Sequence, residues 1–132
     1  LENGEYLSLT SALQAGDVAL SVVGSSALGS APKLTTQVLN YPNPFTMDSG
    51  TTIGYGLSAD MDVKIIFYTI SGQHIQTLDL RAGFDEGALG KLQNRVFIDR
   101  GVLGRDLPVG VYVYLIVIDD QVVAKQKMVV KS

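Results

Sequence analysis

Apolar and polar residues alternate along much of the chain with a period of two, which is typical of β-strands that bury one face. In residues 62–70 the alternation places Val63, Ile65 and Phe67 on one side. Further strands are predicted at residues 5–10, 16–23, 51–57, 73–80, 94–99, 111–119 and 121–131. No segment keeps a 3.6-residue period, so the pattern predicts an all-β protein.

Turn residues separate these segments. Ser71-Gly72 and Asp119-Asp120 are predicted hairpin turns, while residues 81–94 and 100–110 are predicted loops. Short strands spaced roughly 8–12 residues apart indicate an antiparallel β-sandwich, which we expect to contain about seven to nine strands. The weakest prediction is residues 73–80, where Ile75 falls on one face and Leu78 on the other.

A change of composition divides the chain. Residues 24–33, GSSALGSAPK, are rich in glycine and serine, as linkers are. We therefore expect residues 1–33 to be an extension or the end of a preceding domain, and residues 34–132 to form the sandwich domain. The first residue is Leu1 rather than methionine, so we expect the chain to be part of a longer protein.

The segment Tyr41-Pro42-Asn43-Pro44-Phe45 lies between predicted strands. Proline fixes its own φ angle and favours an extended residue before it, so the segment is expected to be a stiff connection. Tyr41 and Phe45 are expected to close one end of the sandwich as large apolar side chains. The segment lacks the PxxP spacing of polyproline ligands, which favours a structural role.

Composition and charge exclude several classes of protein. With 46% hydrophobic and 17% charged residues the chain is predicted to be globular. Its net charge is −3 and its ten lysines and arginines are scattered, which argues against a nucleic-acid partner. The apolar run at residues 109–118 is too short to span a membrane as a helix. There is no cysteine, and therefore no disulfide or thiol chemistry.

No arrangement of residues predicts catalysis. His74 is the only histidine, and it lies in no metal-binding pattern. Seven acidic residues in or beside turns lack the spacing of a calcium loop; they are Asp48, Asp60, Asp62, Asp85, Glu86, Asp99 and Asp106. Gly83, Gly87 and Gly90 form no phosphate loop, and no Gly-x-Ser-x-Gly sequence occurs. We therefore expect no catalytic, cofactor or metal site and no small-molecule substrate.

The strand at residues 111–118 is apolar on both faces. Tyr112, Tyr114 and Ile116 follow one alternation, and the positions between them are also apolar. A strand with one wet face would carry polar residues there. We expect something to cover this second face, either residues 5–23 or another domain or protein chain. The candidate interaction face consists of Ile66, Val111, Val113, Leu115 and Val117.

The order of several motifs from Tyr41 onward resembles one protein family. After Y-P-N-P-F come T-T-I-x-Y-x-L, V-x-I-x-F-Y-T-I-S-G, N-x-V, G-x-x-L-P-x-G-V-Y-x-Y and K-M-V-V-K. This sequence resembles the immunoglobulin-like C-terminal sorting domains of type IX secretion, and the related domain of flagellar hook-capping proteins. The residues that match are Tyr41, Pro42, Asn43, Pro44, Phe45, Gly72, Asn94, Gly104, Leu107, Pro108, Gly110, Tyr112 and Tyr114.

The resemblance implies an immunoglobulin-like, non-enzymatic domain. In such a family it directs a larger protein through the periplasm to the cell surface, where a sortase removes it and attaches the cargo to lipopolysaccharide. Protein partners are then the secretion machinery. Recognition is expected at residues 107–110 and at the last hairpin, through Lys125, Lys127 and Lys131.

Two further functions stay open. The domain could be a structural module, retained in a multi-subunit extracellular or periplasmic complex and packed on neighbouring subunits through Val113, Leu115 and Val117. A carbohydrate-binding sandwich is a weaker hypothesis, because it needs an exposed aromatic platform. The chain has no tryptophan, and most of its tyrosines follow the strand alternation.

Overall fold

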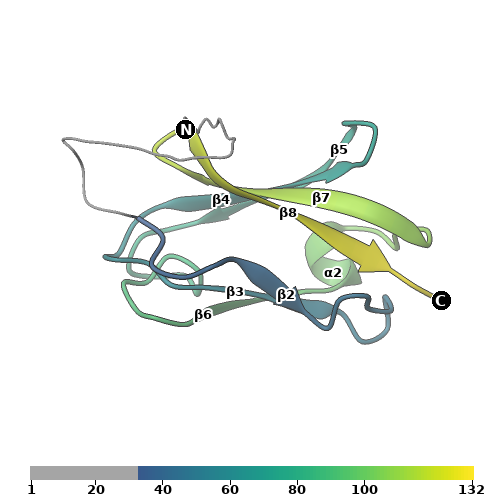
Figure 1. The fold of residues 1–132 in the computed structure, drawn as a ribbon, viewed down its shortest axis with the longest axis horizontal. Coiled ribbons are helices and arrows are strands. Elements are labelled where there is room, and N and C mark those ends of the chain that lie inside the picture. Colours follow the sequence, from purple (N-terminus) through teal and green to yellow (C-terminus); the bar gives the residue numbers. More distant parts are fainter. Residues whose placement is uncertain (1–32) are drawn as a thin grey trace. The chain divides into compact units, whose positions relative to one another are not determined.

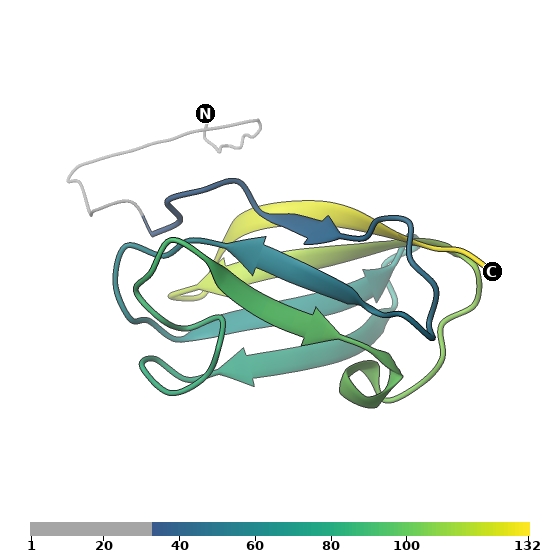
Figure 2. The ribbon, with the colours of Figure 1, turned by 90° about the horizontal axis from the view of Figure 1, so that it is seen from below.

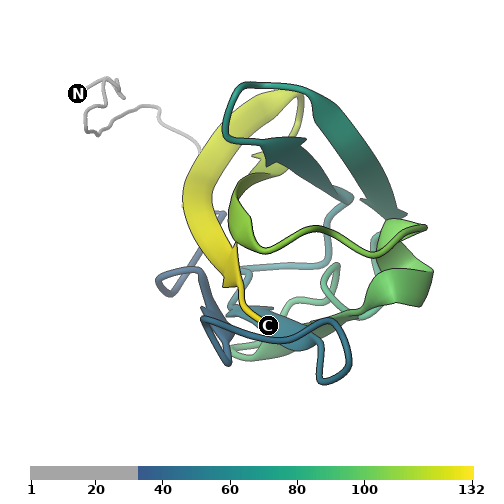
Figure 3. The same ribbon diagram turned by 90° about the vertical axis from the view of Figure 1, so that its right-hand side faces the viewer.

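The computed structural model describes residues 33–132, which form two antiparallel β-sheets facing each other (Figures 1 and 3). The strands predicted at residues 5–10 and 16–23, and all of the predicted extension except Lys33, lie outside the described residues. The prediction of an all-β protein built from packed antiparallel sheets is confirmed for the described part of the chain. No helix there is long and apolar enough to cross a membrane.

One sheet has the strand order β2-β3-β6 and the other the order β5-β4-β7-β8. The first contains β2 (Leu39–Tyr41), β3 (Thr51–Tyr55) and β6 (Asn94–Ile98). The second contains β4 (Val63–Thr69), β5 (His74–Leu80), β7 (Gly110–Ile118) and β8 (Gln121–Val130). Sequence alternation predicted most of these strands to within about two residues at each end, but it did not predict β2.

The core lies between the sheets and consists of the inward residues of both. Phe67 of β4 and Tyr114 of β7 are fully buried neighbours, with ring centroids 6.1 Å apart. They face Ile53 of β3 and Ile98 of β6, which are also fully buried. Large side chains from facing strands therefore fill the core, as the alternating pattern requires.

A β-bulge explains the irregular pattern of β5. Phe67 lies opposite Gln76 and Tyr68 lies opposite His74, so Ile75 has no partner on β4. The extra residue reverses the alternation locally, because a bulge places two residues against one. Ile75 and Leu78 therefore both turn toward the core, and the prediction that they lie on opposite faces is wrong.

The short helix α2 (Arg100–Leu103) lies where the sequence predicted only turns. Asp99 caps its start, accepting a 2.9 Å hydrogen bond from the amide of Val102, and Gly104 ends it with a φ of 78°. Leu103 is its one buried residue. A single turn is too short to produce a helical period in the sequence, which is why it was not predicted.

Candidate functional site

The segment from Tyr41 to Phe45 crosses from one sheet to the other (Figure 2). Phe45 is 0% exposed, and it pairs with the end of β8. Its amide donates to the carbonyl of Val129 at 2.9 Å, and its carbonyl accepts from Lys131 at 2.8 Å. Tyr41 is 82% exposed, so the expectation that it closes the core is wrong. Its place on β2, in register with Thr52 of β3, turns the ring outward.

Asn43 fastens this crossing to β8 through its side chain. Its Nδ2 donates to the carbonyl of Lys127 at 3.2 Å, and its Oδ1 accepts from the amide of Val129 at 2.8 Å. The side chain of Asn43 thus forms with β8 the two hydrogen bonds that the backbone of a neighbouring strand would form. Pro42 contributes through its carbonyl, which accepts a 2.7 Å hydrogen bond from Thr51, while Pro44 joins Asn43 to Phe45.

Buried polar groups join the two sheets beneath this crossing. Tyr114 of β7 donates its hydroxyl to Oδ1 of Asn40 at 3.2 Å, and Nδ2 of Asn40 contacts Oγ1 of Thr51 at 3.2 Å. Burial raises the pKa of Tyr114 above its ordinary value. The hydroxyl is therefore a neutral donor that links β7 to β2.

Asn94 fixes the loop that precedes β6. Its Oδ1 accepts from the amides of Gly87 and Leu89 at 3.1 and 3.2 Å, and its Nδ2 donates to the carbonyl of Leu89 at 2.9 Å. The Tyr55 hydroxyl donates to the carbonyl of Gly87 at 2.8 Å. Burial, together with the charge of Glu86, raises the pKa of Tyr55. The loop is thus tied to both β3 and β6.

Gly104 and the residues after it form the connection into β7. Leu107 is buried in the core, and the carbonyl of Pro108 accepts a 2.6 Å hydrogen bond from the Tyr112 hydroxyl. Burial raises the pKa of Tyr112. Gly110 begins β7, and Val109 before it is exposed. Of the residues 107–110 predicted as a recognition loop, Pro108 and Val109 are therefore the accessible ones.

The other glycine of the motif, Gly72, lies in the turn between β4 and β5. Its φ is 97°, and its amide donates to the carbonyl of Thr69 at 3.0 Å. This backbone conformation favours glycine. Nearby, His74 is exposed, with its Nε2 2.7 Å from Oγ1 of Thr77 and its ring edge against Tyr68. Thr77 and Tyr68, the two side chains that contact the ring, are uncharged.

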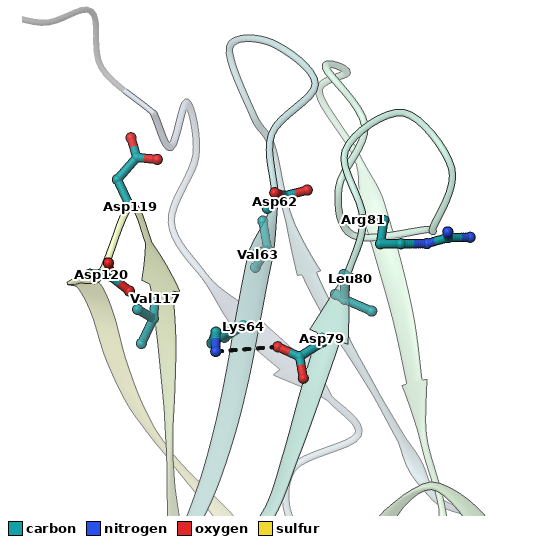
Figure 4. Close-up of a pocket in the computed structure, with 9 residues that line it drawn as sticks. All are labelled: Asp62, Val63, Lys64, Asp79, Leu80, Arg81, Val117, Asp119 and Asp120. Carbon is teal, nitrogen blue, oxygen red and sulfur yellow. Dashed lines mark ion pairs between the residues drawn. The ribbon is translucent and has the colours of Figure 1, made fainter.

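A cleft of about 330 Å³ holds four aspartates near the β7–β8 turn (Figure 4). Asp62 accepts from the amide of Ala82 at 2.8 Å, and Asp79 lies 3.5 Å from Lys64. Asp119 pairs with Lys33 at 2.6 Å. Within residues 33–132 no group of acidic residues and histidine is arranged to hold a metal ion. Three of the four aspartates, Asp62, Asp79 and Asp119, thus pair with groups of the same chain.

The outer side of the four-stranded sheet carries the aliphatic face, defined as Ile66, Val111, Val113, Leu115 and Val117. Val111 is 40% exposed and the other four are half-buried. Ile66 lies directly opposite Leu115 across the strand pair. Among the described elements, no helix or strand lies over this face (Figure 1). The five residues predicted as an interaction face therefore share one accessible surface.

Lysines border the aliphatic face on β8. Lys125 lies opposite Leu115 and Lys127 opposite Val113, and both are exposed. Lys131, also exposed, follows the end of the strand. Within the described residues, these three lysines form no ion pair. The surface thus combines an apolar centre with a cationic border.

The outer side of the three-stranded sheet contains a second hollow of about 520 Å³, here called the Gly54 groove. Gly54 and Thr52 of β3 form its floor. Its walls are formed by Leu39 and Tyr41 on β2, Leu92 before β6, and Arg95 on β6. Phe97, 53% exposed, lies opposite Thr52 on the same face. Sequence reasoning missed this site; Phe97, between two inward residues, indicated only an outward apolar side chain on this strand and not the groove.

Comparisons with protein-family models, curated proteins and solved structures found no match to this chain.

Proposed function

We propose that residues 34–132 are a non-catalytic, immunoglobulin-like domain that directs a larger protein through type IX secretion to the cell surface. The proposal joins the ordered motifs of the sequence to one surface, the aliphatic face with its border of lysines. The secretion machinery would contact this surface on the folded domain, and the exported protein would pass through the periplasm.

The strand order supports the immunoglobulin-like part of this proposal. If β2, β3, β4, β6, β7 and β8 are read as strands A, B, C, E, F and G, then A, B and E share one sheet and C, F and G the other, as in immunoglobulin domains. Tyr112 adds a local detail. Near the start of the F-equivalent strand, its hydroxyl bonds to the backbone four residues upstream, which is similar to a tyrosine corner.

The aliphatic face is the observation that carries the recognition role. Leu115 and its neighbours are only half-buried, so a partner that covered them would remove apolar surface from water at about 25 cal/mol per Å². Lys125 and Lys127 would orient that partner through its acidic groups and speed its association. A folded surface of this kind suits recognition without unfolding.

The test uses the complete parent protein in a bacterium that has type IX secretion. We expect the double variant Val113→Lys/Leu115→Lys to stay inside the cell, because two charges interrupt the apolar centre. The matched control, Thr52→Lys/Phe97→Lys, places the same charges on the other sheet and should be exported normally. Surface exposure is measured by protease accessibility, and folding of both variants by circular dichroism. Normal export of the folded Val113/Leu115 variant would contradict the proposal.

The same face also supports a second function, that of a structural module retained in an extracellular or periplasmic assembly. Intact-mass analysis of the parent protein inside the cell and at its final location separates the two. Loss of the domain on export fits a sorting signal. Retention of the domain in the mature particle would fit a permanent interface.

A further inference from the structure

We infer that the Gly54 groove binds an acidic saccharide, with a pyranose ring over Tyr41 and a sugar carboxylate at Arg95. This site lies on the opposite sheet from the aliphatic face and does not depend on the proposed sorting role. The inference rests on the floor of the groove, the exposure of its aromatic wall and the charge of its lining.

Because Gly54 has no side chain, it leaves a gap on the outer face of β3, the central strand of its sheet. A Cβ atom placed on it would meet only the carbonyl oxygen of Asn94, at 3.7 Å, which is an ordinary contact. Its φ lies outside the left-handed region, unlike that of Gly87. Neither crowding nor backbone conformation therefore requires glycine at this position. A glycine inside a strand often marks the close approach of another molecule.

The wall beside this floor is aromatic and exposed. Tyr41 is in register with Thr52, and Leu39 with Gly54, so the Tyr41 ring borders the opening above β3. At 82% exposure the ring contributes little to the core. A pyranose presents C–H groups on its face, which stack on an aromatic ring, and hydroxyls around its edge. Gln37, Thr52 and Gln93 supply amide and hydroxyl groups for those hydroxyls.

Arg95 gives the groove its charge. It is the one charged residue among those that line the hollow. Its guanidinium donates to Oε1 of Gln93, and within the described residues it forms no ion pair. Glu86, whose Oε2 accepts from the Arg95 amide, forms its ion pair with Lys91 at 3.0 Å, and its charge also interacts with that of Arg95 beyond ion-pair distance. A cation on a chain of net charge −3 favours an anionic ligand, and guanidinium matches the geometry of a carboxylate.

The geometry favours a saccharide over an extended peptide. Peptides that bind β-sheets usually add to a free edge through backbone hydrogen bonds. The groove lies instead on the face of the sheet, where β3 is paired on both sides with β2 and β6. The walls of the groove lie on β2 and β6, which are two strand spacings, or about 10 Å, apart. This width accommodates a sugar ring over Gly54.

The test is calorimetric titration of the full chain with a galacturonic acid tetrasaccharide, and with the neutral galactose tetrasaccharide of the same linkage. We expect the acidic probe to bind roughly tenfold more tightly at low salt. Gly54→Val should abolish binding by filling the floor. Tyr41→Leu should weaken binding of both probes about tenfold. Arg95→Gln should remove the preference for the acidic probe.

Phe84→Leu is the matched control, because Phe84 is 78% exposed beside Arg81 but lies outside the groove. Its binding should equal that of the unaltered chain. The inference is overturned if neither probe binds at millimolar concentration, or if binding survives Gly54→Val. Concentration-dependent dimerisation that Gly54→Val abolishes, without saccharide binding, would also overturn it and assign the groove to a second copy of the chain.

Discussion

The outer faces of the two sheets use apolar residues in different ways. On the aliphatic face, Leu115 lies among Ile66, Val113 and Val117, and the side chains shield one another from water. On the other sheet, Tyr41 stands on the short strand β2 with most of its surface in solvent. A half-buried side chain contributes to folding whether or not a partner binds. A ring that is 82% exposed contributes little to folding, and Tyr41 lines the Gly54 groove instead.

Among these substitutions we expect the largest loss of stability at Asn94, on the three-stranded sheet. Asn94→Ala removes three hydrogen bonds at a 0% exposed position, and it leaves buried amides of the loop without a partner. We expect the free energy of unfolding in urea to fall by about 3 kcal/mol. Saccharide affinity should fall with it, because this loop carries the Leu92 wall of the groove.

Gln93→Ala is the control for Asn94, since the neighbouring side chain is exposed and its loss should change stability by no more than about 0.5 kcal/mol. Equal losses in the two variants would mean that Asn94 does not hold the loop.

A direct comparison of the faces comes from Leu115→Ala and Tyr41→Leu. The first removes half-buried methyl groups and should cost about 1.5 kcal/mol of unfolding free energy, less than a fully buried leucine. The second alters an exposed ring and should stay within about 0.5 kcal/mol. Chemical denaturation measures both. If Tyr41→Leu were the more costly, the distinction between the two faces would fail.

A smaller effect, of opposite sign, is expected at Gly54. Gly54→Val should raise the free energy of unfolding by about 0.5–1 kcal/mol, because valine favours strands and a Cβ fits there. Gly87→Val should instead destabilise, since φ is 100° and a Cβ would lie 2.7 Å from the Tyr55 hydroxyl. Thermal unfolding of the two variants gives the comparison. A loss of stability in Gly54→Val would mean that the groove floor is required by the fold.

The smallest effect concerns Glu86, beside Arg95. Burial alone would raise its pKa, but the hydrogen bond from the Arg95 amide, the hydrogen bond and charge of Lys91, and the charge of Arg95 together lower the pKa below its ordinary value of 4.5. Its stabilising contribution is therefore complete above about pH 4.5 and is lost as the pH falls through the lower folded-state value. In Glu86→Gln the acid-induced loss of stability should be shallower. Water screens this exposed site, and high salt should shrink the difference.

Residues that follow local rules were predictable from sequence. Val63, Ile65 and Phe67 are all buried, as their alternation indicated. The turn at Asp119-Asp120 was placed correctly, and both residues have the positive φ that a type I′ hairpin requires. Ile75 was not predictable, because a bulge depends on how two strands align and leaves the sequence pattern of each strand unchanged.

The surfaces divide in the same way. The aliphatic face could be found from sequence, because the strand is apolar on both sides. When one side of such a strand packs in the core, the other side is an apolar surface. The Gly54 groove could not, because its residues come from β2, β3, β6 and the loop before β6, which only the sheet register brings together. Leu92 and Arg95 carried no pattern of their own.

Period-two alternation is a local property of the backbone, so the order of residues was enough to predict that this chain forms strands, where most of them lie and which side of each is apolar. The positions of the two aromatic residues in Tyr41-Pro-Asn-Pro-Phe45 depend instead on which distant strands each one pairs with. Pairing with β3 turns Tyr41 to solvent, while pairing with β8 carries Phe45 into the core. Two aromatic residues of similar size thus take opposite roles, because strand partners far along the chain set the direction of each side chain.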